Sequence, residues 1–89
     1  MQKPAVLDWD RVIHKNVRTS DLEQIGNIGS EDGESVVILG DRSVQYKVPK
    51  SHVAEFDGSQ VHLDLPMREM GRYIVKSASL FYFYKLSPH

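Results

Sequence analysis

Five short segments with strand character alternate with turn residues between positions 15 and 65 of this chain of 89 residues. They span residues 16–19, 24–29, 35–39, 43–48 and 60–65. Strands this short and this evenly spaced in so small a chain are typical of a small all-β barrel or a rolled sheet. A barrel of this size fills its interior with its own side chains, so the pattern leaves no internal space for a substrate.

We therefore expect an all-β fold, a small closed or partly open antiparallel β-barrel of about six strands with short helical turns. A chain of this length supports one domain. Residues 1–8 are expected to form an N-terminal tail, residues 9–75 the barrel domain, and residues 76–89 a C-terminal aromatic strand or extension.

Helix signals lie at both ends of the barrel domain. Asp8 is suited to cap a helical turn that directs Trp9, Val12 and Ile13 inward. Pro66 is expected to begin a second short helical stretch, because proline is well tolerated in a first helical turn.

The strand segments differ in their patterns. Gly26 and Gly29 within a strand predict bulges or a close approach of the backbone. The unbroken apolar run of residues 36–39 predicts a central strand that is buried on both faces. Residues 44–48 alternate between apolar and polar side chains, which predicts one solvent-facing side. Residues 51–56 are interpreted as a short turn and a loop.

Composition narrows the function classes. The chain has no cysteine, which excludes disulfides and zinc–thiolate sites. Its 11 basic and 12 acidic residues give a net charge of −1, and the basic residues are scattered, so we expect no direct contact with nucleic acid. No apolar stretch is long enough for a signal peptide or for the roughly 18 residues of a membrane span. We therefore expect a cytoplasmic protein without membrane insertion.

The four histidines, His14, His52, His62 and His89, lie in separate elements without the spacing of metal ligands. His62 and Asp64 are two residues apart on one strand and share a face, which is typical of a solvated hydrogen-bonded pair; the alternative is half of an acid–base couple. No nucleophile elbow is present. We expect no enzymatic activity and no catalytic, cofactor-binding or metal-binding residues.

An apolar segment near the C-terminus contains four of the seven Phe and Tyr residues of the chain. It has the composition of a strand, and neither of its faces is polar. Such a strand would be prone to aggregation if it were solitary and exposed, so we expect it to be buried, either along its own barrel or across a subunit interface. The expected interface residues are Leu80, Phe81, Tyr82, Phe83, Tyr84 and Leu86.

Residues 12–21, Val-Ile-His-Lys-Asn-Val-Arg-Thr-Ser-Asp, resemble the opening of the PRC-barrel family. There, a helical turn leads into a strand and a Thr-Ser-Asp turn, followed by an Ile-Gly pair as at residues 25–26. Residues 46–53 and 56–61 resemble the small stand-alone, archaeal-type members, and the similarity covers residues 9–73. His14 and Leu22 stand where glycine is common in the family, so the first hairpin is expected to close differently here.

The resemblance implies a small β-barrel of a kind that often docks proteins. Relatives include the cytoplasmic domain of a photosynthetic reaction-centre subunit, the C-terminal domain of a bacterial ribosome-maturation factor, and small archaeal proteins that act in cell division with a SepF-like membrane anchor. None of these is known as an enzyme. A shared fold does not settle function, and the resemblance carries over no individual site residue.

Two functions follow as hypotheses. The first is a non-enzymatic protein–protein interaction or scaffold module that self-associates as a homodimer, in its most specific form in archaeal cell division with a SepF-like partner. It is motivated by the apolar C-terminal strand, which so small a chain has difficulty burying alone. The alternative is an accessory protein of ribosome maturation or RNA metabolism. No cofactor is expected for either.

Overall fold

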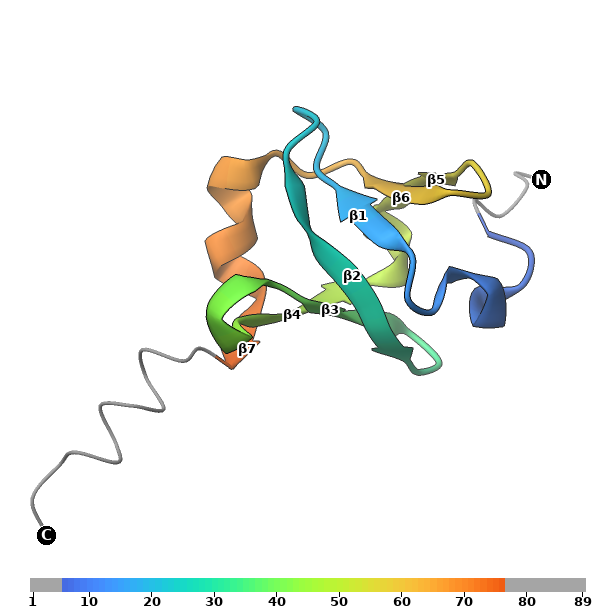
Figure 1. Ribbon diagram of the computed structural model, residues 1–89, viewed down its shortest axis with the longest axis horizontal. Helices are drawn as coiled ribbons and strands as arrows, with labels where there is room; N and C mark the ends of the chain where they lie inside the picture. The colour runs from blue at the N-terminus through green and yellow to red at the C-terminus, as the bar shows by residue number, and fades with distance from the viewer. Residues whose placement is uncertain (1–5, 77–89) are drawn as a thin grey trace, which may run out of the picture.

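The computed structural model of the protein describes residues 6–76, in which seven strands form one sheet in the order β5-β6-β1-β2-β3-β4-β7 (Figure 1). The strands are β1 (Asn16–Arg18), β2 (Gln24–Glu31), β3 (Ser35–Leu39), β4 (Gln45–Pro49), β5 (Val53–Phe56), β6 (Gln60–Leu63) and β7 (Ile74–Lys76). Short 3₁₀ helices join them: η1 (Trp9–Val12), η2 (Asp41–Ser43), η3 (Lys50–His52) and η4 (Met67–Tyr73). The expected small all-β domain is confirmed.

The sheet is rolled but open. Its two end strands are β5 and β7, and no backbone pairing joins them within the described range. The closed form of the expected barrel is therefore not observed. No helix in residues 6–76 has the length and apolar character needed to cross a bilayer.

Two details of the expected sheet are wrong. The loop assigned to residues 51–56 contains a strand, because Val53–Phe56 pairs antiparallel with β6. The sheet is also not antiparallel throughout, because β1 and β6 run parallel, with Val17 opposite Val61. A parallel pair requires a long connection, and here the whole β2–β5 portion of the chain supplies it.

Both glycines of β2 lie at irregular points of the sheet, as the sequence predicts. The pairing of β1 with β2 shifts register beside Gly26, and the pairing of β2 with β3 shifts between Ile28 and Ser30, which leaves Gly29 at a bulge. Gly26 also has a positive φ of 144°. These irregularities increase the local bend and twist of the strand, which helps the sheet to roll.

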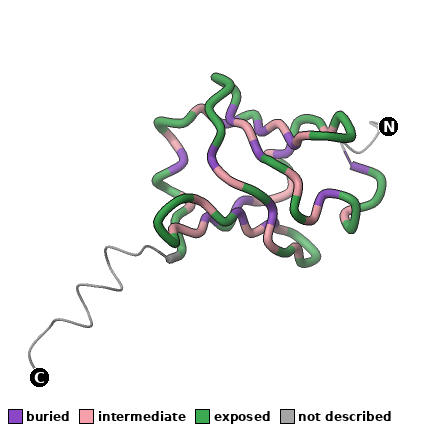
Figure 2. The backbone as a smooth tube through the Cα atoms, viewed as in Figure 1, coloured by how far each residue is buried: buried purple, intermediate pink, exposed green. Residues whose placement is uncertain are grey.

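Buried positions recur along the strands of the rolled sheet (Figure 2), and their apolar side chains form one core cluster. In β3 only Val36 and Ile38 are fully buried, whereas Leu39 is exposed. The expectation that this strand is buried on both faces is therefore wrong, since one face of the open sheet remains toward solvent. The buried apolar residues are Val6, Val12, Val17, Ile25, Ile28, Val36, Ile38, Tyr46, Val48, Val53, Val61, Leu63, Leu65 and Met70.

The N-terminal helical turn forms as expected. The Asp8 carboxylate accepts a hydrogen bond from the backbone N–H of Asp10, Val12 is fully buried, and Trp9 and Ile13 pack against the core. Val6 is buried as well, so residues assigned by sequence to the tail contribute to the core.

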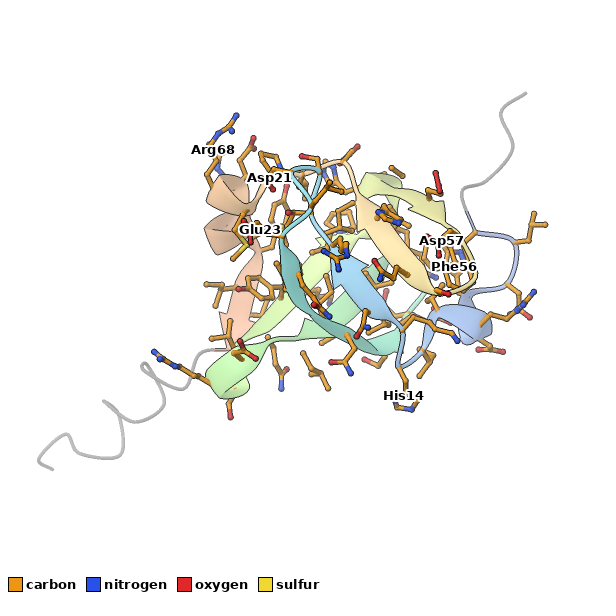
Figure 3. All side chains as sticks on the ribbon, turned by 45° about the horizontal axis from the view of Figure 1, so that its top comes forward. His14, Asp21, Glu23, Phe56, Asp57 and Arg68 are labelled. Atoms are coloured by element: carbon orange, nitrogen blue, oxygen red, sulfur yellow. The ribbon has the colours of Figure 1, made fainter. Side chains whose placement is uncertain are left out.

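The turn between β1 and β2 is tied to η4. Thr19 donates its hydroxyl hydrogen to Asp21 Oδ1, and the same carboxylate oxygen accepts a hydrogen bond from the backbone N–H of Met67, 3.1 Å away. Figure 3 shows Arg68 on the same side of the molecule as Asp21. These contacts hold η4 in place, so that Met70 is buried against the core.

Candidate functional site

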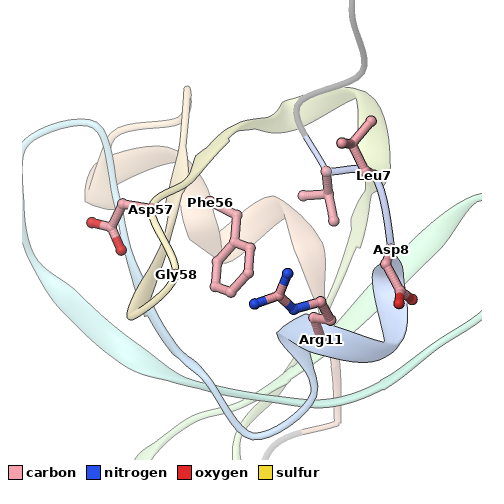
Figure 4. A pocket seen from close by; sticks show the side chains of 7 residues that line it. Leu7, Asp8, Arg11, Phe56, Asp57 and Gly58 are labelled. Carbon is pink, nitrogen blue, oxygen red and sulfur yellow. The ribbon is translucent and has the colours of Figure 1, made fainter.

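A cleft of about 360 Å³ lies between the N-terminal segment and the turn that joins β5 to β6 (Figure 4). The ring of Phe56 and the side chain of Arg11 point toward one another in it. The wall therefore combines an aromatic face with a cation. The lining residues are Val6, Leu7, Asp8, Arg11, Phe56, Asp57 and Gly58.

Asp57 is held rigidly at the edge of this cleft. Its Oδ1 accepts hydrogen bonds from the backbone N–H groups of Gln60, at 2.7 Å, and Ser59, at 2.8 Å. Its Oδ2 lies 3.1 Å from Nε2 of His62. The two backbone hydrogen bonds, and then the contact with His62, lower the pKa of Asp57 to about 2. The group is thus a carboxylate at neutral pH, with one oxygen bound to the backbone and the other facing His62.

Glu55 joins this pair through the register of the hairpin. Its Cα is paired with that of His62 across β5 and β6, so their side chains lie on the same face of the sheet. One donor atom each from Glu55, Asp57 and His62 lie within 4.8 Å of one another. The hairpin therefore gathers two carboxylates and one imidazole on its outer face.

The predicted pair of His62 and Asp64 does not form. Asp64 lies just beyond the end of β6; His62 contacts Asp57, and Asp64 Oδ1 lies 2.8 Å from Nδ1 of His52. His52 packs edge-on against Tyr73, with the ring centroids 5.9 Å apart. Asp57, the partner of His62, lies in the turn between β5 and β6, and His52, the partner of Asp64, lies in η3. Side chains two residues apart along an extended chain are farther from one another than from groups on neighbouring segments.

Family models, curated proteins and solved structures give no match to this chain. These comparisons therefore assign no role to Glu55, Asp57 or His62.

The other unusual feature is the edge of the sheet at β7. Ile74 and Val75 are 39% and 60% exposed there, and β7 is paired with β4 alone within the described range. The six predicted interface residues at positions 80–86 follow this strand in the sequence and lie outside the described residues.

Sequence reasoning missed the cluster of Glu55, Asp57 and His62. The Asp-Gly turn signal at residues 57–58 was visible, and the alternation of residues 61–65 placed His62 on the outer face. Residues 53–56 were not recognised as a strand, however, so Glu55 had no partner. A hairpin hypothesis around Asp57-Gly58 would have found the pair.

Proposed function

We propose that the protein is a non-enzymatic interaction module that forms a homodimer through the β7 edge of its sheet. One observation carries the proposal. Ile38, Tyr46 and Ile74 are matched across β3, β4 and β7, and their exposure rises along this row from 0% through 9% to 39%. The apolar inner face thus continues to an edge that leaves its last member uncovered.

Such an edge is suited to pairing. An end strand presents unpaired backbone N–H and C=O groups that accept a further strand. Here Val75 adds a second exposed apolar side chain beside Ile74. The β7 edge therefore offers an incoming strand both backbone hydrogen-bonding groups and exposed apolar side chains.

We propose a second copy of the chain as the occupant. The apolar segment of residues 80–86 begins only a few residues after β7 in the sequence, and as a strand it would place apolar side chains on both of its faces. One rolled sheet of this size offers apolar cover to one face of such a strand, and a second copy supplies cover for the other. An additional strand beside β7 would also bring the open sheet nearer to a barrel, the closed or partly open form expected from the sequence.

The resemblance to the PRC-barrel family supports a more specific role. His14 and Leu22, which occupy positions where that family commonly has glycine, have φ values of 70° and 67°. This left-handed conformation is the one that glycine adopts most easily. These two backbone conformations support the resemblance, and the resemblance is the basis of the more specific proposal. In this form, the protein acts in the cytoplasm in archaeal cell division, with a SepF-like protein partner.

The oligomeric state tests the proposal. We expect a dimer for the full chain by light scattering coupled to size exclusion, and a monomer after deletion of residues 79–89 or for the double variant Ile74→Thr, Val75→Thr, which keeps the β-branched shape. Leu22→Asn, at an exposed apolar residue elsewhere, is the control and should stay dimeric. A full chain that is monomeric at all concentrations removes the proposal. Co-sedimentation with ribosomal particles would instead support the ribosome-associated alternative.

A further inference from the structure

We propose that Glu55, Asp57 and His62 bind a divalent transition-metal ion, with Zn²⁺ the best fit, on the outer face of the β5–β6 hairpin. The three side chains bring two carboxylate oxygens and one imidazole nitrogen within 4.8 Å of one another. The inference is independent of the proposed dimer, because the cluster uses no residue of β7.

The distances suit a small ion. Zn²⁺ binds nitrogen and oxygen at about 2.0–2.2 Å, so two ligands of a tetrahedral site are roughly 3.4 Å apart. Asp57 Oδ2 and His62 Nε2 are already 3.1 Å apart. Glu55 is exposed, and its carboxylate oxygen lies within 4.8 Å of the other two donor atoms, so the proposal requires a rotation about its side-chain bonds to bring this oxygen to the same separation.

The protein part of the site is organised in advance. Asp57 Oδ1 is bound by two backbone N–H groups, which orients Oδ2 as a single ligand oxygen, as outer hydrogen bonds do in known metal sites. The antiparallel pairing of Glu55 with His62 sets the spacing of the other two ligands. The ion replaces the hydrogen bond between His62 and Asp57, and His62 binds as neutral imidazole.

The donor set selects the class of metal. Imidazole nitrogen is a good ligand for Zn²⁺ and the neighbouring transition metals, whereas Mg²⁺ and Ca²⁺ prefer oxygen ligands alone. Two carboxylates balance the charge of a divalent ion. Three protein ligands leave a fourth position open to water or to a group from another molecule.

The chain provides its own comparison site. His52 and Asp64 form a histidine–carboxylate pair of similar exposure, 2.8 Å apart, but no third ligand of this type is grouped with them in the described part of the chain. A two-ligand pair binds an ion more weakly than a three-ligand cluster. His52→Gln is therefore a matched control for His62→Gln.

Calorimetric titration of the full, untagged chain with ZnCl₂ tests the site. We expect one equivalent to bind, and His62→Gln and Glu55→Gln each to weaken binding at least about tenfold, with His52→Gln unchanged and MgCl₂ giving no binding. In NMR spectra, Zn²⁺ should shift the ring signals of His62 and not those of His52. Thermal melts confirm that each variant is folded.

Two results would overturn the site. One is the absence of saturable Zn²⁺ binding by the folded wild-type chain. The other is binding that survives both His62→Gln and Glu55→Gln, because the ion would then sit elsewhere.

Discussion

The carbonyl oxygen of Leu39 approaches Gly26 so closely that a Cβ atom built on Gly26 would lie 2.0 Å from it. Gly26 also has a φ of 144°, a conformation that other residues rarely adopt. Both facts follow from the irregular pairing of β2 with its neighbours, so this glycine is a requirement of the rolled sheet.

Gly26→Ala should therefore be severely destabilising, by at least about 2 kcal/mol, because it adds backbone strain to a clash with main-chain atoms. Gly71→Ala is the control, since a Cβ there meets nothing within 4 Å and φ is ordinary; it should be neutral or stabilise by up to about 1 kcal/mol. Urea unfolding measures both. Equal stability of the two variants would contradict this account of β2.

Val6 and Leu7 test whether the packed domain extends into the N-terminal segment. Val6 is 4% exposed and Leu7 is 88% exposed. We expect Val6→Ala to lower the free energy of unfolding by about 1–2 kcal/mol through lost burial, and Leu7→Ala to change it by less than about 0.5 kcal/mol. If both variants unfold like the wild type, Val6 does not belong to the core.

Leu22 should gain from replacement by glycine. Its φ of 67° is unfavourable for a branched side chain, and the side chain is exposed. We expect Leu22→Gly to be neutral or to stabilise by up to about 1 kcal/mol, because relief of this strain offsets the greater freedom of glycine in the unfolded chain. Ser20→Gly, in the same turn but at a residue without a positive φ, should destabilise the protein. Urea unfolding compares the two variants. If Leu22→Gly unfolds at a lower urea concentration than Ser20→Gly, the prediction is wrong.

Stability should fall in acid as Asp21 and Asp32 become protonated. The Thr19 hydroxyl, followed by the backbone N–H of Met67, lowers the pKa of Asp21, and the backbone N–H groups of Glu34 and Ser35 lower the pKa of Asp32. A lowered pKa in the folded state means that the stabilisation is present above the unfolded value of about 3.9 and is lost as pH falls through the folded value.

The carboxyl titration of Asp21, followed by NMR, checks the stated cause. Thr19→Val removes the hydroxyl that donates to Asp21, so the pKa of Asp21 should rise toward its ordinary value. Thr19→Ser keeps a hydroxyl and should keep the pKa low. An Asp21 titration that is the same in Thr19→Val and in the wild type would show that Thr19 is not the cause.

Lys50 connects the N-terminal helical turn to the sheet. Its Nζ lies 2.8 Å from Glu31 Oε2 and 4.6 Å from the centroid of the Trp9 ring. Lys50→Met should lower stability by about 1 kcal/mol and change the emission of Trp9, the single tryptophan of the chain. Lys47→Met is the control, since its 3.7 Å pair with Asp32 is half-exposed. Emission that is identical in wild type and Lys50→Met would contradict the Trp9 contact.

The features that were predictable from sequence depend on neighbours in the chain. The Asp8 cap, the bulge-forming glycines of β2, and the alternation that buries Val61 and Leu63 each have a local signature, and all three appear in the structure. The strand β5 was missed because only Val53 of its four residues is fully buried. An end strand with one paired side has little periodicity to detect.

The candidate metal site likewise combines local features, which the sequence predicts, with strand pairing, which it does not. The sequence alone determined that an Asp-Gly turn precedes a strand with His62 on its outer face, because turn residues and side-chain alternation are set by the local backbone. The pairing of Glu55 with His62 is local to the hairpin, but it depends on β5 being a strand and on the register shift between Val53 and Glu55. That β1 runs parallel to β6, and that the row from Ile38 to Ile74 ends at an open edge, follow only from the three-dimensional arrangement. Strand pairing joins residues far apart in the chain, and its register is chosen by the packing of the whole sheet.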